Sequence, residues 1–408
     1  MSDDNKVEAP TSIFEISTFD PEARIDPHPK LKSLREKTRV LRDDGVKTWL
    51  LSHYSDIKKT VNDGTFVRQP HKAEEGSMSR MLANPDDPEG RRSSILCQDN
   101  PDHSSIRVPL MTAFYKRIKK MEPEIESMID AIIDSAPASG RFDLMANIAV
   151  PIPILVIAHI LGVDESRLPE FREWSEGVIL GLNPMRSAEE TETMLACSDK
   201  LNDYFSELMT ARRAEPRDDL ISDMVQAQEA GGDFDDEDLR INLQALLVGG
   251  NLTTTDLIGN GAWLFLTHPE QLDALKANPG LAMQAVEEVL RFEAPVQATS
   301  RIVAEDREVA GCPMKKSQPV FMSLAAANRD PDQFENPETF DITVKRKSHI
   351  SFGGGAHICI GAPLARLEAR RVYTKLFERY PNMTMPAQDI AWRALPFFRG
   401  IEVLEVEV

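Results

Sequence analysis

The spacing of apolar residues divides the chain into a long helical part and a shorter part with strand character. From about Asp102 to His268, apolar residues recur every three or four positions, which predicts a succession of amphipathic helices. Beyond Pro295, short β-branched runs such as RIVAEDREVAG and QPVFMSL alternate with turn residues, which predicts strands. Alternation at 46–52 and in the C-terminal IEVLEVEV predicts further strands. We therefore predict a mainly α fold with a smaller β part.

Two helices have clear ends in the sequence. The first should run from about Asp236 to His268, with Asp235 as its cap and an acidic first turn that complements the helix dipole. The second should run from Ala362 to Arg379, because Pro363 suits a first helical turn and Pro381 cannot continue a helix.

The chain shows no internal repeat, low-complexity tract or linker, so we expect one domain over residues 1–408. Residues 1–30, rich in proline and acids, should form an irregular lead-in. The most apolar stretch, 144–163, is interrupted by two prolines and His159, so a buried helix is a better interpretation than a membrane span. The polar, acidic N-terminus is unlike a signal peptide, and we expect a cytoplasmic protein.

Charge and cysteine content exclude several classes of protein. The formal net charge of -19 disfavours general binding to nucleic acid or to anionic membranes. The four cysteines are widely spaced and form no CxxC pair, so they indicate neither a disulfide framework nor a zinc module.

The segment FGGGAHICIG, residues 352–361, carries the most specific chemistry. Its three glycines allow positive φ and close approach to a flat group. Cys359 lies just before the helix that begins near Ala362, where the helix dipole and backbone N–H groups favour a thiolate. A thiolate can bind a metal axially, and a metal with its own equatorial ligands, such as haem iron, fits better than zinc. On the cysteine alone, an inert buried side chain remains the alternative.

The wider loop resembles the haem-binding loop FGxGxHxCxG of the cytochrome P450 family. That resemblance implies haem b (iron protoporphyrin IX) ligated by Cys359, within a fold that has an α-rich haem-binding core and a β-rich subdomain. The positions that match are Phe352, Gly353, Gly355, His357, Cys359 and Gly361.

Two other segments match motifs of the same family. Glu288 and Arg291 lie three apart, which allows an ion pair on one helix face, and they resemble the structural ExxR motif. The third partner of this pair could be either Arg346 or Arg329, and the sequence does not choose between them.

His103 and Arg107 lie four apart and would share a helix face. Taken alone, they fit an ordinary charged surface as well as a binding site. They resemble the family's HxxxR segment, whose side chains bind the haem propionates, and the same resemblance implies that Arg301 and His357 complete this clamp. An arginine fork suits a carboxylate.

The long helix from Asp236 contains VGGNLTTTDLIGNG, which is a poor helix former. A harmless bend is one interpretation. The segment resembles the family's central oxygen-activating helix, which aligns Gly249, Gly250 and Thr253. The resemblance gives the Thr253 hydroxyl a role in dioxygen activation and proton delivery.

This helix departs from the family pattern at one position. Leu252 stands where an acid is typical, and leucine cannot relay a proton. We hypothesise that Asp256, one turn further along, or water beside Asn251 replaces the acid.

The resemblance also implies a distal pocket for a hydrophobic small molecule such as a terpenoid, steroid, fatty acid or aromatic compound. The loop 69–96 and the helices near 179–194 would set the shape of this pocket. Its expected lining is Ala245, Val248, Val296, Thr299 and Phe397.

A local basic face could steer an acidic electron donor, and we expect a 2Fe–2S ferredoxin with an NAD(P)H-dependent reductase. Ordinary solvated helix charge is an equally good interpretation. The cations are Lys116, Arg117, Lys119, Lys120, Arg366, Arg370 and Arg371.

Together the matches predict a bacterial-type haem-thiolate monooxygenase that uses dioxygen to hydroxylate its substrate. Leu252 motivates an alternative, a peroxide-driven or oxidative-coupling member of the family. A non-enzymatic haem sensor or carrier is the second alternative.

Overall fold

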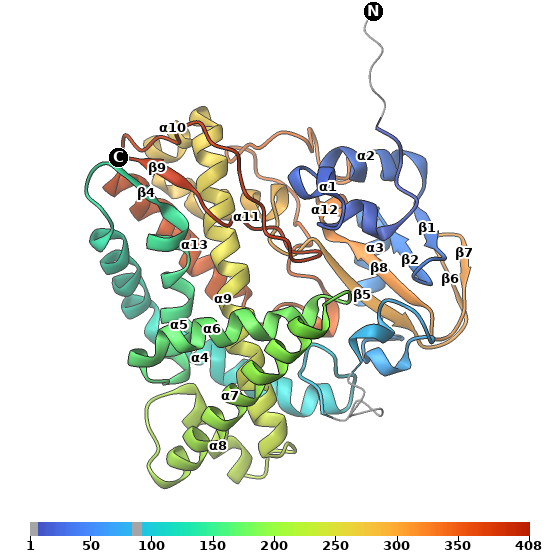
Figure 1. Ribbon diagram of the computed structural model, residues 1–408, viewed down its shortest axis with the longest axis horizontal. Helices are drawn as coiled ribbons and strands as arrows, with labels where there is room; N and C mark the ends of the chain where they lie inside the picture. The colour runs from blue at the N-terminus through green and yellow to red at the C-terminus, as the bar shows by residue number, and fades with distance from the viewer. Residues whose placement is uncertain (1–6, 84–91) are drawn as a thin grey trace, which may run out of the picture.

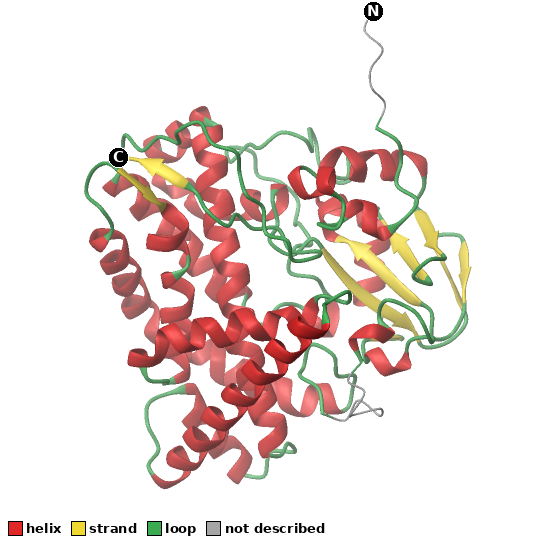
Figure 2. Cartoon of the chain, in the orientation of Figure 1, coloured by secondary structure: helices red, strands yellow, loops and turns green. Residues whose placement is uncertain are grey.

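The long helices lie on one side of the molecule and the five-stranded sheet on the other, while β4 and β9 pair on the helical side (Figures 1 and 2). The predicted mainly α fold with a smaller β part is confirmed. The computed structural model describes residues 7–83 and 92–408. The α-helices are α1 Pro21–Ile25, α2 His28–Lys37, α3 Tyr54–Asn62, α4 Asp102–Ser135, α5 Pro151–Leu161, α6 Leu168–Ile179, α7 Ala188–Ala214, α8 Leu220–Glu229, α9 Asp236–Thr267, α10 Pro269–Ala277, α11 Ala282–Phe292, α12 Leu324–Asn328 and α13 Ala362–Arg379.

The two helices with clear end signals lie where the sequence predicts them. Helix α13 has its predicted bounds, with proline in its first turn. Helix α9 begins directly after Asp235, whose Oδ1 accepts a hydrogen bond from the Asp238 N–H at 2.9 Å. This bond satisfies one of the free N–H groups of the first turn, which explains why α9 begins there.

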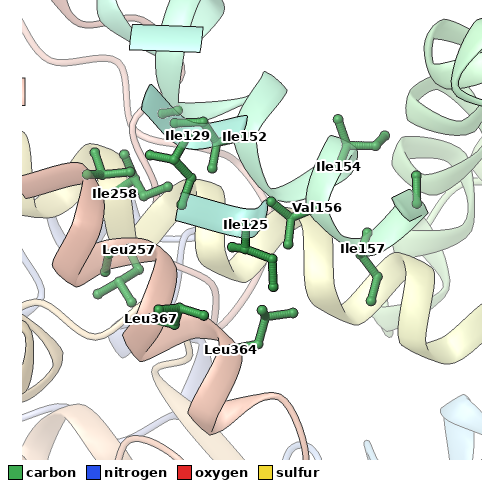
Figure 3. Packing of buried hydrophobic residues seen from close by; sticks show 14 of the residues in the cluster. Ile125, Ile129, Ile152, Ile154, Val156, Ile157, Leu257, Ile258, Leu364 and Leu367 are labelled. Carbon is green, nitrogen blue, oxygen red and sulfur yellow. The ribbon is translucent and has the colours of Figure 1, made fainter. Parts of the chain in front are cut away.

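Helices α4, α5, α9 and α13 pack around one apolar core (Figure 3). The apolar stretch 144–163 forms a π-helical turn and then α5, and most of its side chains are buried, as predicted. No helix among the described residues is long and apolar enough to cross a membrane. Each fully buried Leu or Ile contributes about 1.5–3 kcal/mol. The central contacts come from Ile125 and Ile129 of α4, Ile152 and Val156 of α5, Leu257 and Ile258 of α9, and Leu364 and Leu367 of α13.

The largest sheet has the strand order β1-β2-β8-β5-β3. It combines strands from residues 40–67 with strands from residues 298–323. Strand β2 runs parallel to β8, whereas β3 and β5 pair antiparallel with Phe66 opposite Val303 and Val67 opposite Ile302. Two small two-stranded sheets, β4 with β9 and the hairpin of β6 with β7, complete the strands. The bounds are β1 Val40–Asp43, β2 Thr48–Leu51, β3 Phe66–Val67, β4 Arg141–Asp143, β5 Ala298–Val303, β6 Arg307–Val309, β7 Cys312–Met314, β8 Pro319–Ser323 and β9 Glu405–Glu407.

The chain ends differ from their predicted structure. The described part of the expected lead-in, from residue 7, holds a 3₁₀ turn at Ile13–Ile16 and helix α1, and it is therefore more regular than predicted. Side chains of Ser12 and Asp20 accept hydrogen bonds from the first turns, which stabilises such short helices. At the other end, only Glu405–Glu407 of the predicted terminal strand pairs with β4.

Candidate active site

The cysteine loop is a tight turn between Ile350 and the start of α13. The Gly353 N–H donates to the Ile350 carbonyl at 2.8 Å, and the Cys359 N–H donates to the Phe352 carbonyl at 2.9 Å. Gly353 and Gly355 have φ of 68° and 65°, the left-handed region that favours glycine. These bonds and angles hold the cysteine beside the N-terminus of the helix.

Two of the three glycines allow the loop to pack against helix α3. A Cβ on Gly354 would lie 2.7 Å from Val61 Cγ2, and one on Gly355 would clash with the Val61 carbonyl oxygen. The Gly355 N–H donates to Asn62 Oδ1 at 3.0 Å. The sequence analysis expected all three glycines to allow close approach to a flat group. At Gly354 and Gly355 this expectation is corrected, because the close neighbour there is α3.

The Cys359 side chain is exposed at the surface of the protein chain, but protein groups crowd its sulfur. Burial raises the pKa of the thiol, while the N–H groups of Gly361 and Ala362 and the charge of Arg107 act in the opposite direction. The described residues contain no group of three His, Cys, Asp or Glu side chains that could hold a metal ion. A metal at this sulfur must therefore bring most of its own ligands.

The four residues predicted to bind propionates lie near this loop. His103 and Arg107 are buried on α4, and Arg107 donates to the carbonyl oxygen of Ile358, next to the cysteine. The rings of His103 and His357 lie 4.2 Å apart between centroids. Arg301 is buried on β5, and its charge acts on His357. The structure thus brings together residues that are up to 254 positions apart in the chain.

This group carries positive charge with no acidic partner. Among the described residues, no carboxylate forms an ion pair with Arg107, Arg301 or either histidine, and His103 Nε2 is buried without a hydrogen-bond partner. Burial, with Arg107 beside it, lowers the pKa of His103 to about 4, and burial and the neighbouring cations lower the pKa of His357 to about 2. Burial and the nearby Arg68 lower the pKa of Arg301 to about 9. Such a site is suited to carboxylates.

Arg68 belongs to the same group, although no sequence motif indicated it. Its charge is the largest electrostatic cause, after burial, of the lowered pKa of both Arg301 and His357. Arg68 follows β3 directly, and β3 pairs with β5, the strand of Arg301. Only the strand register, which is a tertiary feature, could have revealed this neighbour.

The middle of α9 borders open space at Gly249. This glycine is exposed, and a Cβ built on it would meet no atom within 4 Å. A Cβ on Gly250 would lie 3.3 Å from Ile157 of α5, so the second glycine serves helix packing. The Thr253 hydroxyl donates to the Gly249 carbonyl at 2.9 Å, which closes the helix turn at this point.

The predicted pocket residues come from three segments. The Gln297 N–H donates to the Phe397 carbonyl at 2.9 Å, which joins the start of β5 to the C-terminal segment. Val296 forms a bridge with Phe398 in the same contact, and Phe397 itself has a φ of 63°. Thr299 accepts a hydrogen bond from Arg68. Ala245 and Val248 lie in the turn of α9 that precedes Gly249.

Comparison with known proteins identifies relatives that match nearly the whole chain. The family model "Cytochrome P450" matches residues 280–393. The chain is 34% identical over 404 residues to Cytochrome P450 107B1 of Saccharopolyspora erythraea, covering 97% of this chain and 98% of that protein. The chain belongs to the cytochrome P450 family. This membership makes it a monooxygenase, and P450 proteins bind haem through a cysteine thiolate, here that of Cys359.

Two further P450 proteins show the range of its relatives. The chain is 34% identical over 390 residues to Vitamin D(3) 25-hydroxylase of Pseudonocardia autotrophica, which covers 93% of each protein. A solved structure, the myxobacterial cytochrome P450 CYP267B1 in complex with myristic acid, superposes with a TM-score of 0.88 at 33% identity. That match covers 97% of this chain and 99% of the other.

The residues present fit the haem of a P450. The accessible sulfur of Cys359 offers one axial ligand, and the cationic group around Arg301 and His357 offers partners for two carboxylates. Gly249 of α9 borders open space, because a Cβ built on it would meet no described atom within 4 Å.

The P450 ExxR pair is a buried ion pair, and its third partner is Arg346. Arg291 donates to Glu288 at 2.7 and 2.8 Å and also to the carbonyl oxygens of Pro337 and Thr339. Arg346 Nε lies 3.0 Å from Glu288 Oε2. The other candidate, Arg329, pairs with Glu338 instead. Arg291 thus connects α11 to the loop that precedes the cysteine.

Asp256 lies on the side of α9 that faces the C-terminal segment. Its Oδ1 accepts a hydrogen bond from Arg393 Nη2 at 2.9 Å, its Oδ2 is buried without a partner, and Gly400 packs directly against the carboxyl group. Burial raises its pKa to about 6 even though Arg393 opposes the shift. The proton-relay role of Asp256 stays a prediction.

Most cations of the predicted basic face are paired within the protein. Lys116 and Lys119 are the two members of that set with no acidic partner among the described residues. The ion pairs of the other five join Arg117 to Asp218 and Asp223, Lys120 to Asp218, Arg366 to Glu287, Arg370 to Glu122 and Glu126, and Arg371 to Asp130.

Proposed function

We propose that this P450 hydroxylates a hydrophobic small molecule with electrons from NAD(P)H that reach it through a reductase and a ferredoxin. The observation that carries the proposal is the position of Cys359, an exposed residue at the N-terminus of α13 near a cationic group that forms no ion pair with a carboxylate of the described residues. One relative is named Vitamin D(3) 25-hydroxylase and one solved P450 structure holds myristic acid, which supports an apolar substrate for this protein.

The bound haem would supply reductive activation of dioxygen at its iron. In this proposal, Cys359 would hold the iron, Phe352 and Gly361 would help to bind the haem, and the propionates would be held by His103, Arg107, Arg301 and His357. The Thr253 hydroxyl, which donates to the Gly249 carbonyl, would serve in dioxygen activation and proton delivery. Ala245, Val248, Val296, Thr299 and Phe397 would orient the substrate.

We propose that the ferredoxin docks on lysines that form no ion pair with an acid in residues 7–83 and 92–408. Lys58 and Lys59 are exposed on α3, which packs against the cysteine loop, and Lys116 and Lys119 are exposed on α4, the helix of Arg107. Free cations attract an acidic partner, whereas internally paired ones contribute little field.

The test is spectroscopic and then catalytic. Protein reduced under carbon monoxide should show the long-wavelength Soret band that gives the family its name. A compound screen by Soret shift should then identify apolar ligands, and ferredoxin, reductase and NAD(P)H should convert those ligands to hydroxylated products. A preparation without that band, even after addition of haemin, would contradict the proposal.

A second candidate is a peroxide-driven or oxidative-coupling P450, and Leu252 favours it because the usual acid is absent. Efficient turnover with hydrogen peroxide, combined with none from the ferredoxin system, would select this candidate. The single domain over residues 1–408 and the cytoplasmic location remain proposals in either case.

A further inference from the structure

Arg68 and Arg301 form a like-charged pair on neighbouring strands. Strand β3 ends at Val67, which lies opposite Ile302 of β5, so the antiparallel register places Arg68 next to Arg301. Like charges at facing strand positions are unfavourable unless something compensates them. Arg68 Nη1 donates to Thr299 Oγ1 at 3.3 Å, and Arg301 Nη1 donates only to the carbonyl of its neighbour Ser300. Neither bond neutralises a guanidinium charge.

The nearest acid is engaged elsewhere. Asp99 accepts a hydrogen bond from the Arg68 backbone N–H at 2.7 Å, and its other oxygen accepts one from Lys72 Nζ at 3.1 Å. Among the described residues, no carboxylate forms an ion pair with the side chain of Arg68, Arg107 or Arg301. Three guanidinium groups therefore lie at this site without an ion pair to any carboxylate of the described residues, although the charge of Asp99 acts on Arg68 and Arg301.

The field of Arg68 acts on three of the four side chains that are expected to hold the propionates. Its charge lowers the pKa of His103, Arg301 and His357, which places the guanidinium among the side chains expected to hold the propionates. The half-buried Arg68 guanidinium has five N–H donors, and its one hydrogen bond to a side chain, to Thr299 Oγ1, leaves other donors for a carboxylate.

We propose that Arg68 is a carboxylate-binding residue of the haem pocket. The inference rests on the proposed haem site and extends it to a residue outside the family motifs. The carboxylate has two sources: a haem propionate held jointly with Arg301, or an acid group of a substrate seated beside Thr299.

The first experiment measures haem retention in the holoenzyme. Haem transfer to excess apomyoglobin is followed for the parent, Arg68→Gln, Arg68→Lys and Lys72→Gln. If a propionate is bound, Arg68→Gln should lose haem about tenfold faster, because a charge-assisted hydrogen bond is lost. Arg68→Lys should be intermediate, since it retains the charge and loses the fork. Lys72→Gln should match the parent, because Lys72 already pairs with Asp99.

The second experiment separates the two sources. Kd values for myristic acid and for methyl myristate are measured by Soret shift with the same variants. If Arg68 binds a substrate acid, Arg68→Gln should weaken myristic acid about tenfold, leave the ester unchanged and retain haem like the parent. If the parent does not bind myristic acid, haem transfer alone decides.

Parent-like haem transfer, together with a parent-like ratio of acid to ester affinity in Arg68→Gln, would overturn the proposal. That result would leave the proposed function intact, because the carbon monoxide spectrum and turnover do not depend on it. Loss of the carbon monoxide band in the parent would instead remove the proposed function.

Discussion

Asp256 and Arg393 form an ion pair with 2.9 Å between Oδ1 and Nη2, and it links the central helix α9 to the C-terminal segment that carries Phe397. The carboxyl group is fully buried, whereas Arg393 is partly exposed. The carboxylate therefore carries the cost of desolvation, and this explains why its pKa is raised despite a cationic partner.

The raised pKa predicts a pH-dependent stability. The pKa of Asp256 rises from 3.8 to about 6 on folding, so the folded state holds this proton more tightly than the unfolded state. The contribution is fully present below pH 4 and is lost as the pH rises through 6. Asp256→Asn should remove this dependence, and its stability relative to the parent should increase by about 1 kcal/mol between pH 5 and pH 7. Urea unfolding at pH 5 and pH 7 measures the free energy of unfolding of both proteins. The same difference between variant and parent at the two pH values would contradict the prediction.

The proton-relay hypothesis for the same residue predicts a catalytic effect. If Asp256 replaces the acid missing at Leu252, Asp256→Asn should form less product per NAD(P)H, by about tenfold. Unchanged coupling would exclude Asp256 from the relay. Thr253→Ala is the reference, because its hydroxyl is expected to act at the oxygen itself.

The cysteine assignment predicts a selective spectral loss. Cys359→Ser should abolish the characteristic carbon monoxide band, because an alcohol does not replace a thiolate as the iron ligand. Cys312→Ser, in β7, should leave the band unchanged. Loss of the band in Cys312→Ser, or its survival in Cys359→Ser, would place the ligand elsewhere.

The buried pair on α11 predicts unequal costs for its two arginines. Arg291→Gln removes the bidentate partner of Glu288 and should cost about 3–5 kcal/mol, since a buried carboxylate loses its main counter-charge. Arg346→Gln leaves that pair in place and should cost about 1–2 kcal/mol. Guanidinium chloride unfolding of the two variants measures the difference. Equal losses would show that Arg346 shares the structural role fully.

The docking proposal predicts which cations matter for electron transfer. Lys116→Gln combined with Lys119→Gln should slow ferredoxin-driven reduction about three- to tenfold at low salt. Added salt should reduce the difference in rate between the parent and this double variant. Arg371→Gln should leave the reduction rate unchanged, because Arg371 is already paired with Asp130. A rate that depends on Arg371 and not on the lysines would reverse the assignment.

Local signals predicted local features well. The bounds of α13 and the start of α9 depend on Pro363 and Asp235, which act within one helical turn. The resemblance to the family identified His103, Arg107, Arg301 and His357 as a group, and the structure brings them together beside the cysteine loop.

Features that depend on distant partners could not be predicted in this way. Arg68 joins the site through the register between β3 and β5, and no motif records that register. The basic face is largely neutralised by acids far away in the chain, as with Arg371 and Asp130, which are 241 positions apart. The choice of Arg346 over Arg329 likewise required the folded loop.

The contact between Gly355 and Asn62 has a consequence for how the protein matures. These residues are 293 positions apart in the chain. Their hydrogen bond and the packing of the loop on Val61 hold the cysteine loop against α3. The turn can therefore close only after residue 355 has been synthesised and has met α3. We expect haem binding to follow that contact between distant parts of the chain. A fragment limited to residues 280–393, the part that the family model matches, lacks α3 and would not assemble the turn by itself.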